Sequence, residues 1–316
     1  MIEIQIAGPF TTIQDRGRQG YQHIGVPTSG ALDDDALLLG NALIGNHESC
    51  AAIEICFGGF QASVDRPTAL CLTGSIKAQM IIHKPTGKRL EIACAVPVVA
   101  EDGDRIEIPP FGDTLSAVLA IGGGIDVALI YGSRSTTVNA MLGGLEGRCL
   151  QDGDKLDCGN SDTQNAQASA CDKDLYEAHF APQTTLRIIA GPQDFWFTPE
   201  ALATLTTTPF LVSPQTSRMG MRLSGESLAH KGPADIISDG MVRGAIQVPA
   251  DGQPIIAMAD HGTMGGYTKI ACVISADLGA LGRLRPNLKI TFEMVTEKEA
   301  KQALEAKSAR LRALMP

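Results

Sequence analysis

The sequence has no excess of positive charge. Its 316 residues include 26 Lys and Arg against 35 Asp and Glu, which gives a formal net charge of −9. Phosphate backbones and anionic headgroups repel an acidic chain, which argues against nucleic acid and membrane surfaces as partners. Hydrophobic residues make up 44% and charged residues 19%, an ordinary globular balance. Because a chain of this length exceeds the usual size of one core, two domains are expected.

Targeting and membrane-spanning segments are also lacking. Residues 1–6 alternate like a strand and have neither the basic start nor the apolar centre of a secretory signal. The longest apolar run is bracketed by Asp113 and Asp126, so no uncharged stretch reaches the length that crosses a bilayer. The eight cysteines are scattered, and no two have the two-residue spacing of a redox or zinc motif. Reduced thiols and a cytoplasmic location are therefore expected.

Motifs for several common chemistries are missing. The six histidines are isolated, and the nearest approach to a metal site, His261 beside Asp260, is interpreted as an ordinary histidine. Residues 122–124 are three glycines without the Gly-Lys-Ser/Thr ending of a phosphate-binding loop. Ser133 is not in a Gly-x-Ser-x-Gly elbow, and we interpret its hydroxyl as one that positions the backbone or an anion. The sequence has no Ala-Met-Lys biotin-attachment motif.

Short strands dominate what the sequence does contain. Between residues 51 and 121, apolar strands alternate with glycine turns, which predicts a barrel or a sandwich. The polar stretch 161–180 is predicted to be a linker between domains at 1–160 and 181–316. A strand that ends in Ala-Gly-Pro opens each half, which suggests a duplicated domain. Helices are expected at 31–44, after the capping pair Thr198-Pro199, at 275–284 and at 296–314.

Ionisable side chains gather in glycine-rich loops of both halves. Residues 11–33 form a long loop that carries Asp15, Arg18 and His23, and from chemistry alone it is equally a working surface or a solvated connector. The polar residues of the second half are Arg218, Ser238, Asp239, Gln247, Asp251, Asp260 and Lys269. Carboxylates, guanidiniums and a lysine together suit polarising a carbonyl and placing a carboxylate or phosphate.

Residues 11–33 and five further motifs, in order, resemble one family over almost the whole chain. Besides residues 11–33, they are Gly132-Ser133-Arg134-Ser135-Thr136, Gly143-Gly144-Leu145-Glu146-Gly147-Arg148, Ser217-Arg218-Met219-Gly220, and two stretches at 244–254 and 265–271. The family is the carboxyltransferase type that includes the C subunit of 5-oxoprolinase, the second subunit of allophanate hydrolase or urea amidolyase, and the KipA proteins. The resemblance implies a mainly β fold with a few helices, built as two tandem cyclophilin-like β-barrel domains.

The resemblance implies the C subunit of an ATP-dependent 5-oxoprolinase, which opens 5-oxo-L-proline to L-glutamate together with separate A and B subunits. Phosphorylation of the lactam oxygen would create a leaving group that water could attack, which needs cations for the phosphoryl charge and a carboxylate to orient water. Candidate catalytic residues are Asp15, Arg18, Asp239, Asp260 and Lys269. Candidate substrate-binding residues are Gln14, His23, Arg134, Arg218, Gln247 and Tyr267. No metal is predicted, and ATP is expected in the complex.

Two alternatives remain open. One is the carboxyltransferase half of a urea or amide carboxylase, in which carboxybiotin arrives on a separate protein. The other is a non-catalytic, KipA-like regulatory binding protein, which the departures of residues 260–268 from the family's usual forms keep open. Arg134 is equally a site residue or one side of an interdomain ion pair. Because isolated buried charges are costly, we expect Asp15 and Arg18 to share a cleft with Arg218, Gln247 and Lys269.

Overall fold

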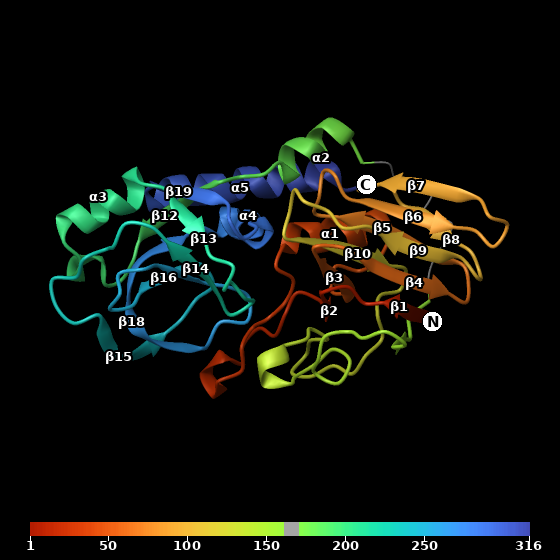
Figure 1. Ribbon diagram of the computed structural model, residues 1–316, viewed down its shortest axis with the longest axis horizontal. Helices are drawn as coiled ribbons and strands as arrows, with labels where there is room; N and C mark the ends of the chain where they lie inside the picture. The colour runs from red at the N-terminus through yellow and green to blue at the C-terminus, as the bar shows by residue number, and fades with distance from the viewer. Residues whose placement is uncertain (161–170) are drawn as a thin grey trace. The chain divides into compact units, whose positions relative to one another are not determined.

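The computed structural model describes residues 1–160 and 171–316, which form two compact units. Unit 1 comprises Met1–Arg18, Ser29–Ala181 and Ala309–Pro316, and unit 2 comprises Gln19–Thr28 and Pro182–Ser308. Most of the ordered structure is strand, with a few helices (Figure 1), so the predicted mainly β class is confirmed. No helix in the described ranges has the length and apolar character needed to cross a membrane.

Unit 1 contains two antiparallel sheets. The first has the order β11-β1-β4-β9-β6-β7 and the second the order β2-β3-β10-β5-β8. The strands of the first sheet are β1 (Ile2–Ile6), β4 (Phe60–Val64), β6 (Gln79–His83), β7 (Arg89–Ala93), β9 (Arg105–Ile108) and β11 (Lys155–Leu156). Those of the second are β2 (Phe10–Gln14), β3 (Ala52–Cys56), β5 (Thr68–Thr73), β8 (Val98–Ala100) and β10 (Ser116–Ile121).

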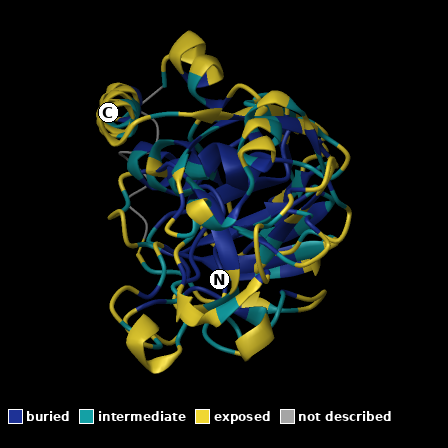
Figure 2. Ribbon diagram, turned by 90° about the vertical axis from the view of Figure 1, so that its left-hand side faces the viewer, coloured by how far each residue is buried: buried dark blue, intermediate teal, exposed yellow. Residues whose placement is uncertain are grey.

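The second sheet is buried on both faces, which explains its continuous apolar strands. In β10, Leu119 packs into the core that also holds residues of the first sheet, whereas Val118 packs on the opposite side with helix α1 (Asp34–Leu43). Helix α2 (Lys173–Phe180) adds its Tyr176 and Phe180 to this second core. Figure 2 shows the buried residues in dark blue at the interior of the ribbon.

Helix termini follow the predicted caps. The Asp33 carboxylate accepts hydrogen bonds from the first-turn amides of α1, and Gly45 follows its last residues with φ of 71°. In helix α5 (Glu297–Leu314), Thr296 Oγ1 accepts from the amide of Glu299, and the Glu299 carboxylate accepts from the Thr296 amide at 2.8 Å. Most of α5 is exposed (Figure 2), with its last residues in unit 1. The capping box predicted here is therefore confirmed.

Unit 2 is a closed barrel of seven strands. Its strands pair in the order β12-β19-β13-β14-β17-β16-β18, β18 pairs back to β12, and β15 adds to the outer edge of β18. The ring strands are β12 (Thr185–Ala190), β13 (Phe210–Val212), β14 (Gly220–Ser224), β16 (Ala245–Val248), β17 (Ile255–Ala257), β18 (Met264–Val273) and β19 (Lys289–Met294). Strand β15 spans Asp235–Gly240, and the remaining helices are α3 (Pro199–Thr207) and α4 (Leu278–Arg283).

The linker and the duplication take a different form from the one expected. Residues 161–170, the first part of the predicted linker, lie outside the described residues, and its last part forms α2 because Tyr176 and Phe180 are buried. Both units open with a strand that ends before Gly-Pro, at β1 and β12. Strand orders nevertheless differ between the two-sheet unit 1 and the barrel of unit 2. The short sequence echo is therefore not accompanied by a repeated topology.

Candidate functional site

The carboxylate of Asp15 lies buried at the end of β2 and binds the chain itself. One oxygen accepts from the amide of Gly17 at 2.8 Å and from the hydroxyls of Ser133 and Ser135 at 2.6 and 2.5 Å. The other accepts from the amide of Arg134 at 2.6 Å. Four donors thus converge on one side chain that is 5% exposed. The Ser133 hydroxyl, which the sequence analysis interpreted as positioning the backbone or an anion, donates to the Asp15 carboxylate and accepts from the Ser135 amide at 3.0 Å.

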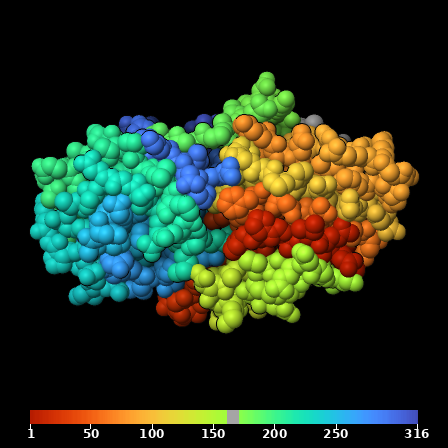
Figure 3. Space-filling model, in the orientation of Figure 1, coloured from red at the N-terminus to blue at the C-terminus, as the bar shows by residue number. Residues whose placement is uncertain are grey.

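Arg18 supports the same segment from the other side. It is fully buried, and its guanidinium donates to the Ile130 carbonyl at 3.2 Å, to the Thr137 hydroxyl at 3.0 Å and to the Ser135 carbonyl. A buried guanidinium needs such acceptors because its desolvation is costly. Figure 3 shows the supported segment, coloured yellow-green, as a surface band beside the red N-terminal strands of unit 1. Catalytic roles for Asp15 and Arg18 stay predictions.

Two predicted substrate-binding residues lie in the same unit. Gln14 is 1% exposed, and its amide nitrogen donates to the Thr12 hydroxyl and the Thr136 carbonyl at 3.0 Å each. Its amide oxygen has no partner among the described residues. Arg134 donates to the Val127 carbonyl and to the Asp126 carboxylate, both at 2.9 Å. The partner in this ion pair belongs to unit 1, so the pair is not an interdomain one.

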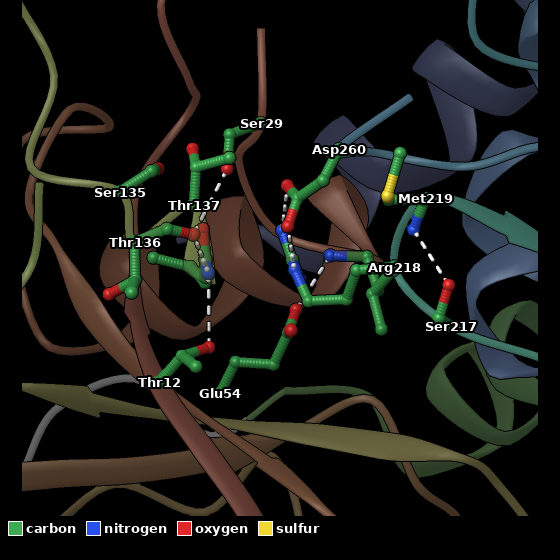
Figure 4. A network of polar contacts seen from close by, with 12 residues as sticks. Thr12, Ser29, Glu54, Ser135, Thr136, Thr137, Ser217, Arg218, Met219 and Asp260 are labelled. Carbon is green, nitrogen blue, oxygen red and sulfur yellow. Dashed lines mark hydrogen bonds and ion pairs between the residues drawn. The ribbon is translucent and has the colours of Figure 1, made fainter. Parts of the chain in front are cut away.

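Arg218 and Asp260 form a buried pair in unit 2. The guanidinium donates twice to the carboxylate, at 2.9 and 3.0 Å, and the Asp260 amide donates to the Arg218 carbonyl at 2.7 Å (Figure 4). The neighbouring His261 is 3% exposed, and burial lowers its pKa. Neutral imidazole therefore dominates there near neutral pH. Within residues 1–160 and 171–316, no group of three or more His, Cys, Asp or Glu is arranged to hold a metal ion.

The second polar group of the barrel unit is only partly enclosed. Lys269 on β18 has a side chain that is 5% exposed, and its ammonium donates to the Asp239 carboxylate of β15 at 3.1 Å. The Asp239 side chain is 56% exposed. Its pKa lies below the ordinary value, mainly because of the hydrogen bond from Lys269 and also because of the one from the Gly240 amide. The amide oxygen of Gln193 accepts from the backbone of Lys269 at 3.1 Å.

Two further predicted residues line the same strands, and one lies elsewhere in the unit. Gln247 on β16 stands directly opposite Lys269 on β18, so both side chains lie on one face of the barrel wall. Tyr267, two residues before Lys269, is 39% exposed. His23 is exposed in a short 3-10 turn at Gln22–Ile24. Asp239, Gln247, Tyr267 and Lys269 are thus brought together, whereas the shared cleft with Asp15 and Arg18, which lie in unit 1, stays a prediction.

Comparisons with known proteins give the family. The profile of the carboxyltransferase domain, subdomain A and B, matches residues 24–294. The chain belongs to this family. It is 35% identical to the 5-oxoprolinase C subunit of Escherichia coli, over 96% of this chain and 94% of that protein. It is 30% identical to urea amidolyase of Lachancea kluyveri, over 99% of this chain and 18% of that protein. The resemblance predicted from the motifs is therefore confirmed.

Solved structures show the same carboxyltransferase fold. The Kluyveromyces lactis urea carboxylase superposes with a TM-score of 0.89 and 25% identity, over 100% of this chain and 30% of the other. The K. lactis urea amidolyase gives the same score and identity over 20% of its length. The chain therefore corresponds to a fraction of these large proteins, while it matches the bacterial subunits over nearly their full length.

Gln193 contacts Lys269, and the sequence analysis did not include it among the candidate site residues. It follows the Ala190-Gly191-Pro192 turn, which packs directly on β18: a Cβ on Gly191 would lie 2.2 Å from the Lys269 carbonyl oxygen. This close approach requires glycine and brings Gln193 against Lys269. The repeated Ala-Gly-Pro sequence led to the interpretation of this turn as the start of a domain. The polar glutamine directly after the turn is the sequence feature that could have indicated the contact with Lys269.

Proposed function

We propose that the chain is the C subunit of an ATP-dependent 5-oxoprolinase, which acts with separate A and B subunits to open 5-oxo-L-proline to L-glutamate. The full-length correspondence carries the proposal. The chain covers 94% and 93% of two bacterial 5-oxoprolinase C subunits, but 18% of the urea amidolyases. A separate subunit of matching length supports a complex assembled from several chains. The relatives' names support a role in an enzyme complex.

The part of this chain that suits a small polar substrate is the cluster on β15, β16 and β18. Lys269 offers an ammonium, Gln247 and Gln193 offer amides, and Asp239 offers an exposed carboxylate. Such groups recognise the carboxylate and amide of a lactam amino acid by hydrogen bonds and charge. In this proposal the chain binds and orients the substrate.

The arginines proposed to bind phosphate do not suit a nucleoside triphosphate. In the described part of the chain, Arg18, Arg134 and Arg218 bind carbonyls or carboxylates of the chain itself. The sequence also lacks a phosphate-binding loop. We therefore assign ATP to a partner subunit, and we derive no step of the reaction in this chain through the nucleotide.

Reconstitution tests the proposal. The purified chain alone should release no glutamate from 5-oxo-L-proline, and ATP-dependent release should appear when A- and B-type subunits are added. Lys269→Met should abolish the reconstituted activity, whereas Lys173→Met, at an exposed ion pair on α2, should leave it unchanged. Glutamate release by the chain alone would contradict the need for partners. Absence of release in the full mixture, with each subunit folded, would contradict the reaction.

A second candidate is the carboxyltransferase half of a urea or amide carboxylase. The superposition on urea carboxylase over the whole of this chain favours it. In that case carboxybiotin would arrive on a separate protein, because the sequence has no biotin-attachment motif. Transfer of labelled carboxyl from a carboxybiotin carrier to urea in the presence of this chain, without glutamate formation, would favour this function over the first.

A further inference from the structure

Lys269 holds a buried charge with little compensation. Its side chain is 5% exposed, and the carboxylate of Asp239 is the acceptor of its ammonium within the described residues. An ammonium has three donors, so this bond leaves two of them for other acceptors. Desolvation penalises a charged amine unless anionic or polar groups surround it. The position therefore favours an anion close to the Lys269 nitrogen.

The anion that is present comes from a loosely attached strand. β15 pairs with β18 alone, and its register shifts between Asp235 and Asp239. The residues between them lack regular pairing, and Ile237 is 95% exposed. Asp239 itself is 56% exposed, so its carboxylate can turn into solvent. Moving this carboxylate away from Lys269 therefore disturbs neither the barrel ring nor its core.

Gln193 completes a receptor for a carboxylate. Its oxygen is held by the backbone amide of Lys269, which fixes the side chain beside that residue, and the same side chain helps to lower the pKa of the Asp239 carboxylate. An ammonium and an amide thus lie near one carboxylate. Gln247 lies opposite Lys269 on β16, and its amide extends over Gly265 of β18, where an added Cβ would lie 2.4 Å from the amide nitrogen. The Gln247 amide itself donates to the Tyr267 carbonyl at 3.4 Å, so polar groups from three segments of the barrel unit lie near Lys269.

We propose that Lys269 and Gln193 form a recognition site for the carboxylate of a small ligand, and that Asp239 is a built-in counter-ion which the ligand displaces. Asp239 occupies the position that the ligand's carboxylate takes in the bound state. The identification of that ligand as 5-oxo-L-proline rests on the proposed function. The exchange of the Asp239 carboxylate for a ligand carboxylate does not rest on that function.

NMR titration of the full chain tests the exchange at the site itself. The reporters are the Gln193 side-chain amide and the backbone amide of Lys269, titrated with sodium acetate at constant ionic strength. Removal of the competing carboxylate in Asp239→Ala should tighten acetate binding about fivefold, the factor set by loss of an exposed ion pair. Lys269→Met should abolish the shifts. Glu177→Gln, which frees the exposed Lys173 on α2, is the matched control and should leave both reporters unchanged.

The outcomes distinguish a failure of the carboxylate exchange from a failure of the proposed substrate. If acetate binds Asp239→Ala no more tightly than the wild-type chain, or if Lys269→Met retains the shifts, the exchange is refuted. Binding of 5-oxo-L-proline should exceed that of pyrrolidin-2-one, which has the ring without the carboxylate. If acetate shows the exchange but 5-oxo-L-proline binds no better than acetate, the proposed substrate fails and the carboxylate site stands. Intact amide spectra of each variant establish that it is folded.

Discussion

The substitution Asp15→Asn separates a structural role from a catalytic one. The carboxylate accepts four hydrogen bonds at 2.5 to 2.8 Å, two of them from Ser133 and Ser135. Asparagine keeps the shape but replaces one oxygen by an NH₂ group, which would face the Arg134 amide, another donor. One bond is lost, a buried donor is left without a partner, and the remaining bonds lose their charge. Because hydrogen bonds to charged groups contribute about 1.5–3 kcal/mol each, the free energy of unfolding should fall by about 3 kcal/mol.

Urea denaturation followed by far-UV circular dichroism measures the global loss. Amide hydrogen exchange at Ser133 and Ser135 measures the local one, which matters because the sole tryptophan, Trp196, lies in unit 2. Asp126→Asn is the control: that side chain is 64% exposed and makes one ion pair with Arg134, so its loss should cost less than about 0.5 kcal/mol.

The opposite result would refute this reasoning. If Asp15→Asn unfolds with the wild-type free energy and exchanges at the wild-type rate, the four short contacts contribute little. Loss of reconstituted activity in such a stable variant would then restore the prediction that Asp15 is catalytic.

Three further predictions concern the turn, the ion pair and a thiol. Gly191→Ala should prevent soluble expression or markedly lower the melting temperature, because its Cβ would meet the Lys269 carbonyl at 2.2 Å, whereas Gly232→Ala, with no atom within 4 Å, should be neutral. NMR titration should find the pKa of Asp239 below its ordinary 3.8 and returning toward it in Lys269→Met; the pair's stabilisation is therefore present above pH 3.8 and lost as pH falls through the lowered value. Desolvation raises the pKa of the half-buried Cys94 thiol to about 12, so the native chain should resist iodoacetamide at this thiol at pH 8, and rapid labelling would contradict the raised pKa.

Local elements were predictable because their signals are local. Asp33 caps α1 through amides two and three residues away, and Thr296 and Glu299 form the capping box of α5 within one turn. The β5 and β10 strands were recognisable because burial on both faces demands continuous apolar residues. The polar composition before residue 170 did not reveal that Tyr176 and Phe180 anchor a helix in the core, since two aromatic residues in a short segment carry no clear period.

The residue types of the candidate site were predictable from the sequence, but the contacts that each of these residues makes were not. Asp15 accepts hydrogen bonds from Ser133 and Ser135, which lie 118 and 120 residues away along the chain. No periodicity in the sequence predicts contacts over such a separation. The Lys269 contact to Gln193 spans 76 residues and depends on the backbone approach at Gly191. The family motifs indicate the loops that carry these charged residues, but the pairing of the charges within them is set by tertiary contacts.

The hydrogen-bond and ion-pair partners of the charged residues distinguish side chains that the sequence places in similar loops. Asp15 has four donors, Arg18 has carbonyl and hydroxyl acceptors, and Arg218 meets Asp260 in a two-bond, buried pair. Groups so fully bonded stabilise loops and lose those bonds if they turn to a substrate. Lys269 differs, because its buried ammonium is balanced by one exposed carboxylate on an edge strand. The ammonium of Lys269 is buried, but its counter-ion Asp239 is exposed at the surface. An incoming anion can therefore replace Asp239 beside this ammonium without unfolding the chain.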